Sequence, residues 1–465
     1  MTNLHFGVFE VYAPQVGGTY SWAHPLCDAA DYLDPERWVR MAKIMDRTGY
    51  DFLFFADGFG YPMQNGDISA ACLSAAINFS GLDPSTIIPI LARETENLGF
   101  VVTATTGMDH PLPLSRRFST LDHLTRGRIG WNVVTGASQN AVAELFGHPE
   151  MVAHDTRYEM AEEYVSLARS YWEHSWDDDA LVADAASGVY IDPSRIHRTQ
   201  FEGAHYRSRG YFGAPPSPQR TPVIFQAGTS PKGRALAASH AEGVFVQATT
   251  PEHTAAAVAD IRRRAAEAGR DPGDIRIMAG LTAIVDETQA GAEQLWREFH
   301  GMQSDEVVAA LYAGNTGIDL LTLDPDKTLA EVVAAGGIVG QMGTSNIERF
   351  LGRDGAPAPT VRQILDDLRG KGTRGFRIVG DAEHVADRVE ELAEKTGLDG
   401  FLFEPVFGTR DVEAFGELVL PRLRDRGLLP EPAGPTLRER MRERPGARLE
   451  RAGKDSAPGA AAMPA

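Results

Sequence analysis

The chain is poor in cysteine and has no long apolar segment. Its 465 residues include two cysteines, Cys27 and Cys72, which are too few for a disulfide framework and fit a reducing compartment. No Cys-x-x-Cys pair and no His-Glu-x-x-His spacing occurs, so the sequence predicts no metal site. No run approaches 18 uninterrupted apolar residues, and the N-terminal residues do not resemble a signal peptide. We therefore expect a cytoplasmic protein.

Basic residues are also scarce relative to acidic ones. The chain carries 45 Lys and Arg against 64 Asp and Glu, which gives a formal net charge of -19. Nucleic acids and anionic membranes attract basic surfaces, so this balance argues against both as partners. We expect the partner to be a small molecule.

Two common nucleotide-binding motifs are missing. No G-x-G-x-x-G sequence follows a candidate strand, and no G-x-x-x-x-G-K-[ST] sequence occurs. These absences exclude a dinucleotide site of the Rossmann type and a Walker P-loop.

Short apolar runs alternate with helical patterns along most of the chain. Runs such as FLFF at residues 52–55 suit strands buried on both faces, as in a parallel sheet. We predict eight strands, at His5–Val11, Tyr50–Asp57, Leu98–Thr105, Arg128–Thr135, Pro222–Gly228, Gly243–Thr249, Ile275–Val285 and Gly400–Val406. Between and after them we predict helices at Pro35–Thr48, Pro84–Asn97, Asp155–Trp176, Lys232–Ala241, Pro251–Ala268, Ala382–Thr396 and Asp411–Arg426. This order predicts an α/β fold, a (β/α)8 TIM barrel, with a doubly wound open sheet as the alternative.

Two connections are too long for simple barrel loops. They span about residues 177–221 and 286–374, and we expect both to lie over the mouth of the barrel as binding loops or lids. We assign residues 1–429 to the barrel and 430–465 to a C-terminal tail. The early part of the tail could form a solvated helix, and we expect the last dozen residues to be disordered.

Four consecutive predicted strands end in polar side chains. Asp57 follows the second, Thr103 lies in the third, Asn132 in the fourth, and Gly228, Thr229 and Ser230 follow the fifth. In α/β barrels the carboxyl ends of the strands form the mouth where chemistry takes place. Turn and cap residues have the same composition, but four such ends in succession favour a binding site.

The turn GTSPKG at residues 228–233 is suited to a phosphate group. Glycine permits close approach of the backbone, and the helix that follows offers free N–H groups at its positive end. His154 and Tyr158 are four residues apart at the start of another predicted helix, hence on one face. Both can donate to an anion, although a helix cap at Asp155 with Tyr158 packed on the surface explains them equally well.

Several ordered motifs resemble one enzyme family. They are RRFSTLDH at 116–123, GRIGWNVVT at 127–135, RY at 157–158 with AEEY at 161–164, PVIFQAG at 222–228, VG at 379–380, VAD at 385–387 and DGF at 399–401. On these motifs, the chain resembles the two-component FMN-dependent monooxygenases that include nitrilotriacetate monooxygenase, dibenzothiophene-sulfone monooxygenase and pristinamycin synthase. The resemblance runs from the first strand to about residue 425 and implies the bacterial luciferase-like superfamily.

The resemblance implies a luciferase-like barrel, reduced FMN as cofactor and O2 as co-substrate. A C4a-(hydro)peroxyflavin would oxidise a small organic substrate, and a separate NAD(P)H:flavin reductase would supply the reduced flavin. A homodimer or homotetramer is implied as well. By position, the flavin contacts would be Asp57, Thr103, Asn132, His154, Tyr158, Gly228, Thr229 and Ser230, with Asn132 and Thr103 near the reacting ring as catalytic residues.

The chain departs from the family pattern near the fifth strand. FEGAHY stands at 201–206 and GYFG at 210–213, where relatives tend to carry other motifs, so the resemblance does not fix the substrate. These aromatic residues led us to expect an apolar substrate beside residues 201–213. Two alternatives remain, a deazaflavin (F420)-dependent oxidoreductase on the same barrel and a flavin-binding protein without catalysis.

Overall fold

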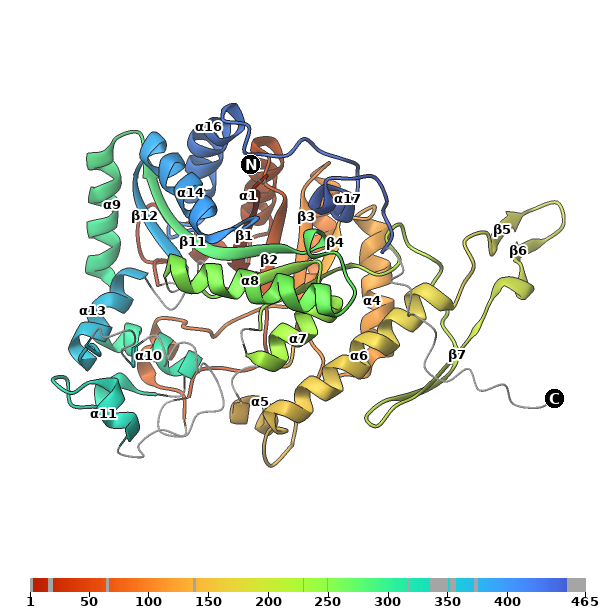
Figure 1. Ribbon diagram of the computed structural model, residues 1–465, viewed down its shortest axis with the longest axis horizontal. Coiled ribbons are helices and arrows are strands. Elements are labelled where there is room, and N and C mark those ends of the chain that lie inside the picture. The colour runs from red at the N-terminus through yellow and green to blue at the C-terminus, as the bar shows by residue number, and fades with distance from the viewer. Residues whose placement is uncertain are drawn as a thin grey trace.

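Eight parallel strands form a closed ring in the computed structural model (Figure 1). The structure describes residues 3–15, 20–63, 67–136, 139–228, 230–248, 250–316, 318–334, 350–351, 357–371 and 375–449. Each strand pairs in parallel with the next, and β13 returns to β1 to close the ring. The ring runs through β1 (His5–Val11), β2 (Phe52–Ala56), β3 (Gly99–Thr105), β4 (Ile129–Val134), β9 (Val223–Gln226), β10 (Gly243–Val246), β11 (Arg276–Asp286) and β13 (Gly400–Phe403).

All eight predicted strands are present, each within a few residues of its predicted bounds, so the barrel prediction is confirmed. The open-sheet alternative is wrong, because β10 pairs with β11 and β13 with β1. A ninth strand of the same sheet, β12 (Phe376–Asp381), was not predicted. It lies outside the ring and pairs with the C-terminal half of β11. Its six residues lead directly into a helix and lack the continuous apolar character of the ring strands.

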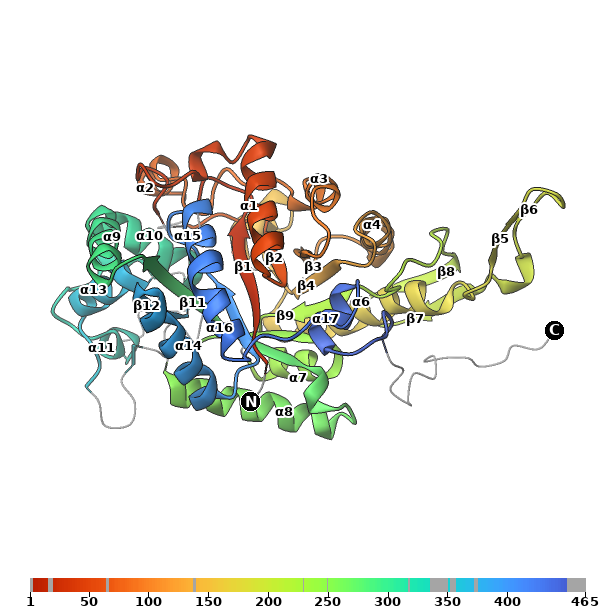
Figure 2. The same cartoon turned by 90° about the horizontal axis from the view of Figure 1, so that it is seen from above.

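Helices surround the ring (Figures 1 and 2). They are α1 (Pro35–Thr48), α3 (Ile88–Arg93), α4 (Pro111–Leu124), α6 (His154–His174), α7 (Pro231–His240), α8 (Pro251–Glu267), α9 (Gln289–Met302), α14 (Ala382–Thr396), α15 (Thr409–Ala414) and α16 (Leu420–Asp425). Local sequence fixes their ends: the Asp34 side chain caps α1 by accepting from the N–H of Glu36, and Gly49 ends it with a φ of 92°. No helix in the described ranges has the length and apolar character needed to cross a bilayer.

The helix predictions fail at several places, and α9 falls inside the connection predicted at 286–374. α4 was not predicted, because prolines at 111 and 113 hide a helix whose first turn tolerates them. The span predicted at Pro84–Asn97 is a 3₁₀ turn, Pro84–Thr86, followed by the shorter α3. The span predicted at Asp411–Arg426 is divided by a π-helical turn, Phe415–Val419, between α15 and α16.

The lower part of the barrel is a packed core rather than a pore. Side chains from seven of the ring strands fill it, namely Phe9, Phe52, Phe54, Val101, Val223, Phe225, Phe245, Met278 and Leu402. The rings of Phe225 and Phe245 stack at 5.6 Å, and Phe54 meets Phe245 edge-on at 5.0 Å. The mouth at the carboxyl ends of the strands is therefore the place left for a ligand.

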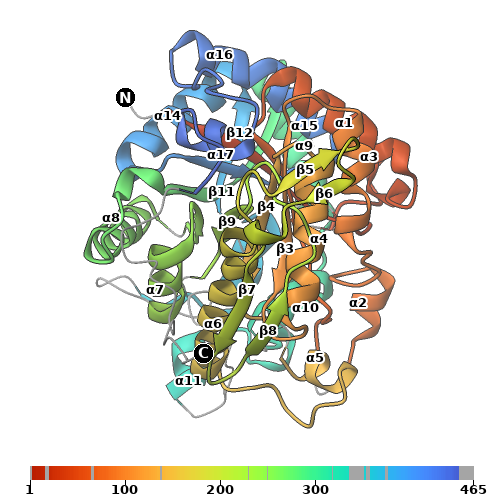
Figure 3. The same cartoon turned by 90° about the vertical axis from the view of Figure 1, so that its right-hand side faces the viewer.

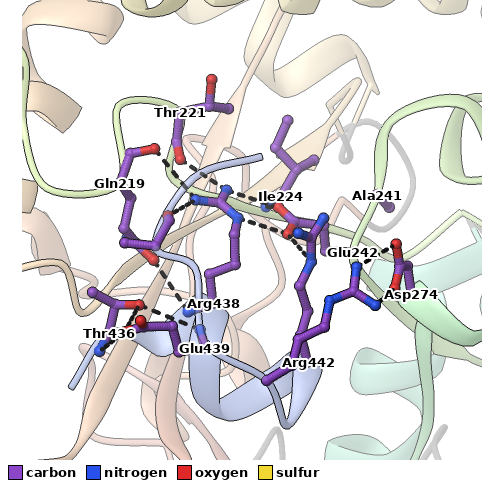
Figure 4. A network of polar contacts seen from close by, with 12 residues as sticks. Gln219, Thr221, Ile224, Ala241, Glu242, Asp274, Thr436, Arg438, Glu439 and Arg442 are labelled. Carbon is purple, nitrogen blue, oxygen red and sulfur yellow. Dashed lines mark hydrogen bonds and ion pairs between the residues drawn. The ribbon is translucent and has the colours of Figure 1, made fainter. Parts of the chain in front are cut away.

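A C-terminal helix closes the opposite end of the barrel. α17 (Leu437–Arg442) begins with a capping box between Thr436 and Glu439, and its Leu437 and Met441 side chains join the barrel core. Arg438 is fully buried and makes a bidentate pair with Glu242, at 2.7 and 2.9 Å (Figure 4). The expected solvated helix is thus a buried plug. The predicted disordered end lies outside the described residues.

The two long connections lie at different places on the barrel. Residues 177–221 form two hairpins on the flank of the barrel beside α6, β5 (Leu181–Asp184) with β6 (Val189–Ile191) and β7 (Arg198–Glu202) with β8 (Arg207–Tyr211) (Figures 1 and 3). The β5–β6 hairpin projects away from the barrel, so the prediction that this connection covers the mouth is wrong for that part. The turn of the β7–β8 hairpin does reach the mouth, where Tyr206 Oη donates to the carbonyl of Thr106, just after β3, at 2.9 Å.

The second long connection fits its prediction better. It contains α10 (Asp305–Thr316), α11 (Leu329–Ala334) and α13 (Val361–Lys371). Helix α10 packs on α2 (Ala70–Ser74), which belongs to the connection that follows β2 at the mouth.

The Glu242–Arg438 pair should be a large contributor to stability. We expect Arg438→Met to lower the free energy of unfolding by about 3–5 kcal/mol, since it removes the bidentate partner of the buried Glu242 and leaves it only the longer contact with Arg442 Nε at 3.3 Å. Denaturation with urea measures this change. The double variant Glu242→Gln with Arg438→Met should recover much of the loss. Arg263→Met, which breaks an exposed pair with Asp260, should cost less than about 1 kcal/mol; equal costs for Arg438→Met and Arg263→Met would contradict the assignment.

His5 should make stability depend on pH above neutrality. Burial lowers the pKa of His5, but Asp51 at 3.2 Å and Glu443 at 3.3 Å more than offset this and raise it from 6.5 to about 9. The stabilisation is complete below the unfolded pKa of 6.5 and is lost as the pH rises through 9. We expect the difference in Tm between wild type and His5→Gln to shrink between pH 6.5 and pH 10. A difference that stays constant over this range would refute the linkage.

Candidate active site

Thr103 and Asn132 lie side by side at the mouth of the barrel. They are paired residues of β3 and β4, and Asn132 Nδ2 donates to Thr103 Oγ1 at 2.9 Å. Thr103 lies two residues beyond the core residue Val101, so both point into the barrel above its packed layer. Both are buried, and among the residues that the structure describes the Oδ1 atom of Asn132 has no hydrogen-bond partner. A buried acceptor of this kind fits an N–H donor of a bound ring.

A glycine corner lies at the end of β9. A Cβ atom added to Gly228 would lie 2.9 Å from Tyr158 Oη and 3.0 Å from the Cα of Gly233, and one added to Gly233 would lie 2.9 Å from both Tyr158 Oη and the Cα of Gly228. Only glycine therefore allows this approach. Ser230 caps α7 by accepting from the N–H of Gly233 at 3.1 Å. Because Pro231 has no N–H and that of Arg234 donates to the carbonyl of Ser230, the N–H of Lys232 is the one that the first turn leaves for a ligand. Thr229, predicted to take part, lies outside the described residues.

The first turns of α6 bring two more predicted residues to this corner. The rings of His154 and Tyr158 are 5.0 Å apart, as expected for residues four apart on a helix. His154 also contacts the Asp155 carboxylate, with 2.9 Å between Nδ1 and Oδ1. A helix N-terminus, a glycine cradle and two side-chain donors together suit the oxygens of a phosphate monoester.

Asp57 stands at the end of β2, next to the strand that carries Thr103. Its carboxylate accepts from the N–H of Gly58 at 2.8 Å. Desolvation by its surroundings raises the pKa of Asp57 to about 6, and the nearby Asp83 adds to the effect. The predicted residues thus form two groups, Asp57, Thr103 and Asn132 on β2 to β4, and His154, Tyr158, Gly228 and Ser230 around the corner.

Two buried polar residues near these groups were not predicted. Glu404 follows β13, is 5% exposed and lies against Gly280, where an added Cβ would be 2.5 Å from its Oε1 atom. Gln226 ends β9 beside Gly228, and its Oε1 atom is buried without a partner. The alternation of inward residues along β13, from Leu402 to Glu404, was the signal that could have identified Glu404.

Comparisons with known proteins agree with this geometry. The family model described as luciferase-like monooxygenase matches residues 4–400. Dimethyl-sulfide monooxygenase of Hyphomicrobium sulfonivorans is 39% identical over 89% of this chain and 84% of its own. Component A of nitrilotriacetate monooxygenase from Aminobacter aminovorans is 32% identical over 94% of this chain and 96% of its own.

Among solved structures, riboflavin lyase with modified FMN and riboflavin superposes with a TM-score of 0.89. It is 37% identical and covers 97% of this chain and 98% of its own. The match over most of the chain, together with the closed barrel and the polar groups at its mouth, identifies the protein as a flavin-dependent enzyme of the luciferase-like monooxygenase family.

Proposed function

We propose that the enzyme uses reduced FMN, with the phosphate in the Gly228 corner and the flavin ring over Thr103 and Asn132. The corner carries the proposal, because it offers a site for one phosphate group at the end of β9, on the same mouth as the unpaired Oδ1 of Asn132. FMN has a single phosphate at one end and ring N–H groups at the other. Deazaflavin enzymes share the fold at 14–17% identity, which supports no more than the fold.

Each group has a defined task in this arrangement. Tyr158, His154 and the first turn of α7 bind the phosphate, and the Asn132 carbonyl accepts a hydrogen bond from the ring. Thr103 holds the Asn132 amide in place through the 2.9 Å hydrogen bond. When bound and reduced, flavin supplies electrons to O2, so that one oxygen atom enters the substrate and the other leaves as water. The packed barrel below and α10 with α2 beside the mouth limit access of water.

Reduced flavin must reach the mouth from elsewhere. The chain has no dinucleotide motif, and its relative from Aminobacter aminovorans is named as component A, which implies a second component. We propose that a separate NAD(P)H:flavin reductase serves this enzyme. The relatives named for dimethyl sulfide and for nitrilotriacetate differ in the charge of those compounds, so the family leaves the organic substrate open.

Anaerobic titration with reduced FMN and reduced riboflavin tests the site. Tyr158→Phe removes a donor to a charged group, worth about 1.5–3 kcal/mol, and should weaken FMN binding roughly 10- to 150-fold. It should leave riboflavin, which lacks the phosphate, unaffected. Asn132→Ala should weaken both ligands alike. Equal losses of FMN and riboflavin in Tyr158→Phe would refute the phosphate placement.

Mixing the reduced complex with O2 tests the activity. We expect oxidised FMN to reappear more slowly than in buffer, because the mouth shields the reacting ring from water. Asn132→Ala should speed this reappearance and the release of hydrogen peroxide, whose final yield, one per reduced flavin, is the same for both proteins when no substrate is present. Reoxidation at the rate of free flavin in the wild type would speak against oxygen transfer.

We also propose that the enzyme forms a homodimer or homotetramer through its flank hairpins. Leu181, Val182, Val189 and Tyr190 of the β5–β6 hairpin are 39–66% exposed, and a two-stranded sheet is marginally stable without cover. The neighbouring β7–β8 hairpin is basic and carries Arg198, Arg207 and Arg209, whereas the chain as a whole has a net charge of -19. The acidic surface of a second copy would therefore complement this basic hairpin.

Sedimentation velocity tests the hairpin contact. We expect wild type to sediment as an oligomer and Tyr190→Asp to shift it toward monomer, because the charge would have to be buried against the partner. Leu33→Asp is a matched control, since Leu33 is 64% exposed on the β1–α1 connection. A monomeric wild type, or equal effects of the two substitutions, would contradict the proposal.

A further inference from the structure

The mouth has an unusual charge pattern. The connections that follow β1 to β4, residues 12–34, 57–87, 106–110 and 135–153, contain no lysine or arginine. They contain nine carboxylates, namely Asp28, Asp31, Asp34, Asp57, Asp67, Asp83, Asp109, Glu144 and Glu150. Helix α10, which packs beside the mouth, also lacks a basic residue and begins with Asp305 and Glu306. An anionic substrate would meet repulsion on this side.

Two nearby arginines are already engaged, and Arg117 of α4 is the remaining cation whose charge acts on Asp57. Arg157 is buried under the β4–α6 connection, and its Nη1 atom donates to the carbonyl of Gly136 at 3.2 Å and contacts Met151 Sδ at 3.4 Å. Arg369 of α13 pairs with Asp305 and Asp366. Lys232 lies in the first turn of α7, at the corner assigned to the phosphate.

The same rim exposes paired aromatic side chains. Phe59 from the β2–α3 connection and Phe146 from the β4–α6 connection are 56% and 40% exposed, and their rings meet edge-on at 5.3 Å. Tyr61 and Phe79 form a second such pair at 6.3 Å. Single exposed apolar residues are common, but two ring pairs on one rim indicate a surface that receives an apolar ligand.

This aromatic cluster, Phe59, Tyr61, Phe79 and Phe146, borders the proposed flavin site. Phe59 is two residues beyond Asp57, and its connection follows β2. Phe146 lies in the connection that follows β4, the strand of Asn132. Strand β3, with Thr103, runs between β2 and β4. The cluster therefore faces the same mouth as the predicted ring site.

We propose that the organic substrate is an uncharged, mainly apolar small molecule, which the aromatic cluster binds and whose anionic analogues the surrounding carboxylates reject. This inference rests on the proposed function, because it takes the mouth as the place of oxidation. The departure of residues 201–213 from the family pattern supports it only through Tyr206. Most of those residues lie on β7 and β8, along α6, whereas Tyr206 reaches the connection after β3 and donates to the carbonyl of Thr106 at 2.9 Å. The aromatic cluster on the rim is what favours an apolar substrate.

A matched set of ligands tests the substrate class without turnover. Hexyl methyl sulfide, 6-(methylthio)hexanoate and 6-(methylthio)hexylamine share one chain length and differ in charge. Calorimetry on the protein with oxidised FMN should show the sulfide binding at least tenfold more tightly than the hexanoate, with the amine less penalised than the hexanoate. Each methylene added to the neutral sulfide should strengthen binding about three- to fourfold.

Variants locate the binding surface. Phe146→Ala should weaken the sulfide about tenfold, and Phe146→Arg should improve the hexanoate relative to the sulfide. Tyr190→Ala is the matched control, because Tyr190 is an aromatic residue 66% exposed on the flank hairpin; it should change neither affinity.

Four results would overturn the inference. They are tighter binding of the hexanoate, no binding of the sulfide up to its solubility, unchanged sulfide affinity in Phe146→Ala, and an effect of Phe146→Ala on sedimentation alone, which would make the cluster a protein contact. Failure of FMN to bind, with the sulfide preference intact, would instead refute the proposed function and leave the apolar site standing.

Discussion

The closure of the barrel between β13 and β1 is the constraint on which the rest of the structure depends. An added Cβ on Gly400 would lie 2.0 Å from the carbonyl oxygen of His5, so no other residue fits at this seam. The preceding Asp399 is buried, accepts from the N–H of Ile277 at 2.7 Å and binds Arg262 at 2.8 Å. One corner thus joins β1, β11, β13 and α8. Without closure, the polar strand ends would not converge on one mouth.

Closure also gives the barrel two different ends: one is sealed by α17 and stabilises the fold, and the other, the mouth, is left for a ligand. The ring of Phe, Val, Met and Leu side chains fills the barrel, and α17 seals it with Leu437 and Met441. The charges at that end, Arg438 with Glu242 and His5 with Asp51, satisfy each other internally. At the mouth, by contrast, the acceptor of Asn132 and the first turn of α7 are left for a ligand. Buried polar groups without a partner are costly, so their presence at the mouth is itself an argument for occupancy there.

The sequence predicted what depends on local pattern. Strands such as Phe52–Ala56 are apolar throughout, and these runs predicted the whole ring. The carboxyl ends of the predicted strands then placed four site residues on one mouth, namely Asp57, Thr103, Asn132 and Gly228. The prediction from sequence failed where contacts between residues far apart in the chain determine the structure. α17 is rich in arginine and looks solvated until Glu242, 196 residues away, is seen to pair with Arg438. The direction of the 177–221 connection likewise depends on packing that no local pattern contains.

In the proposed arrangement, cofactor and substrate are held by different kinds of structure at this mouth. The corner at Gly228 and Gly233 relies on backbone approach and a helix end, where any added side chain would collide. The rim relies on side chains such as Phe59 and Phe146, which belong to connections and not to strands. A substitution on the rim changes the surface presented to the substrate and leaves the ring of strands intact, whereas one in the corner removes the place for the phosphate. This separation explains how one barrel can keep its flavin chemistry while relatives named for such different compounds diverge in what they oxidise.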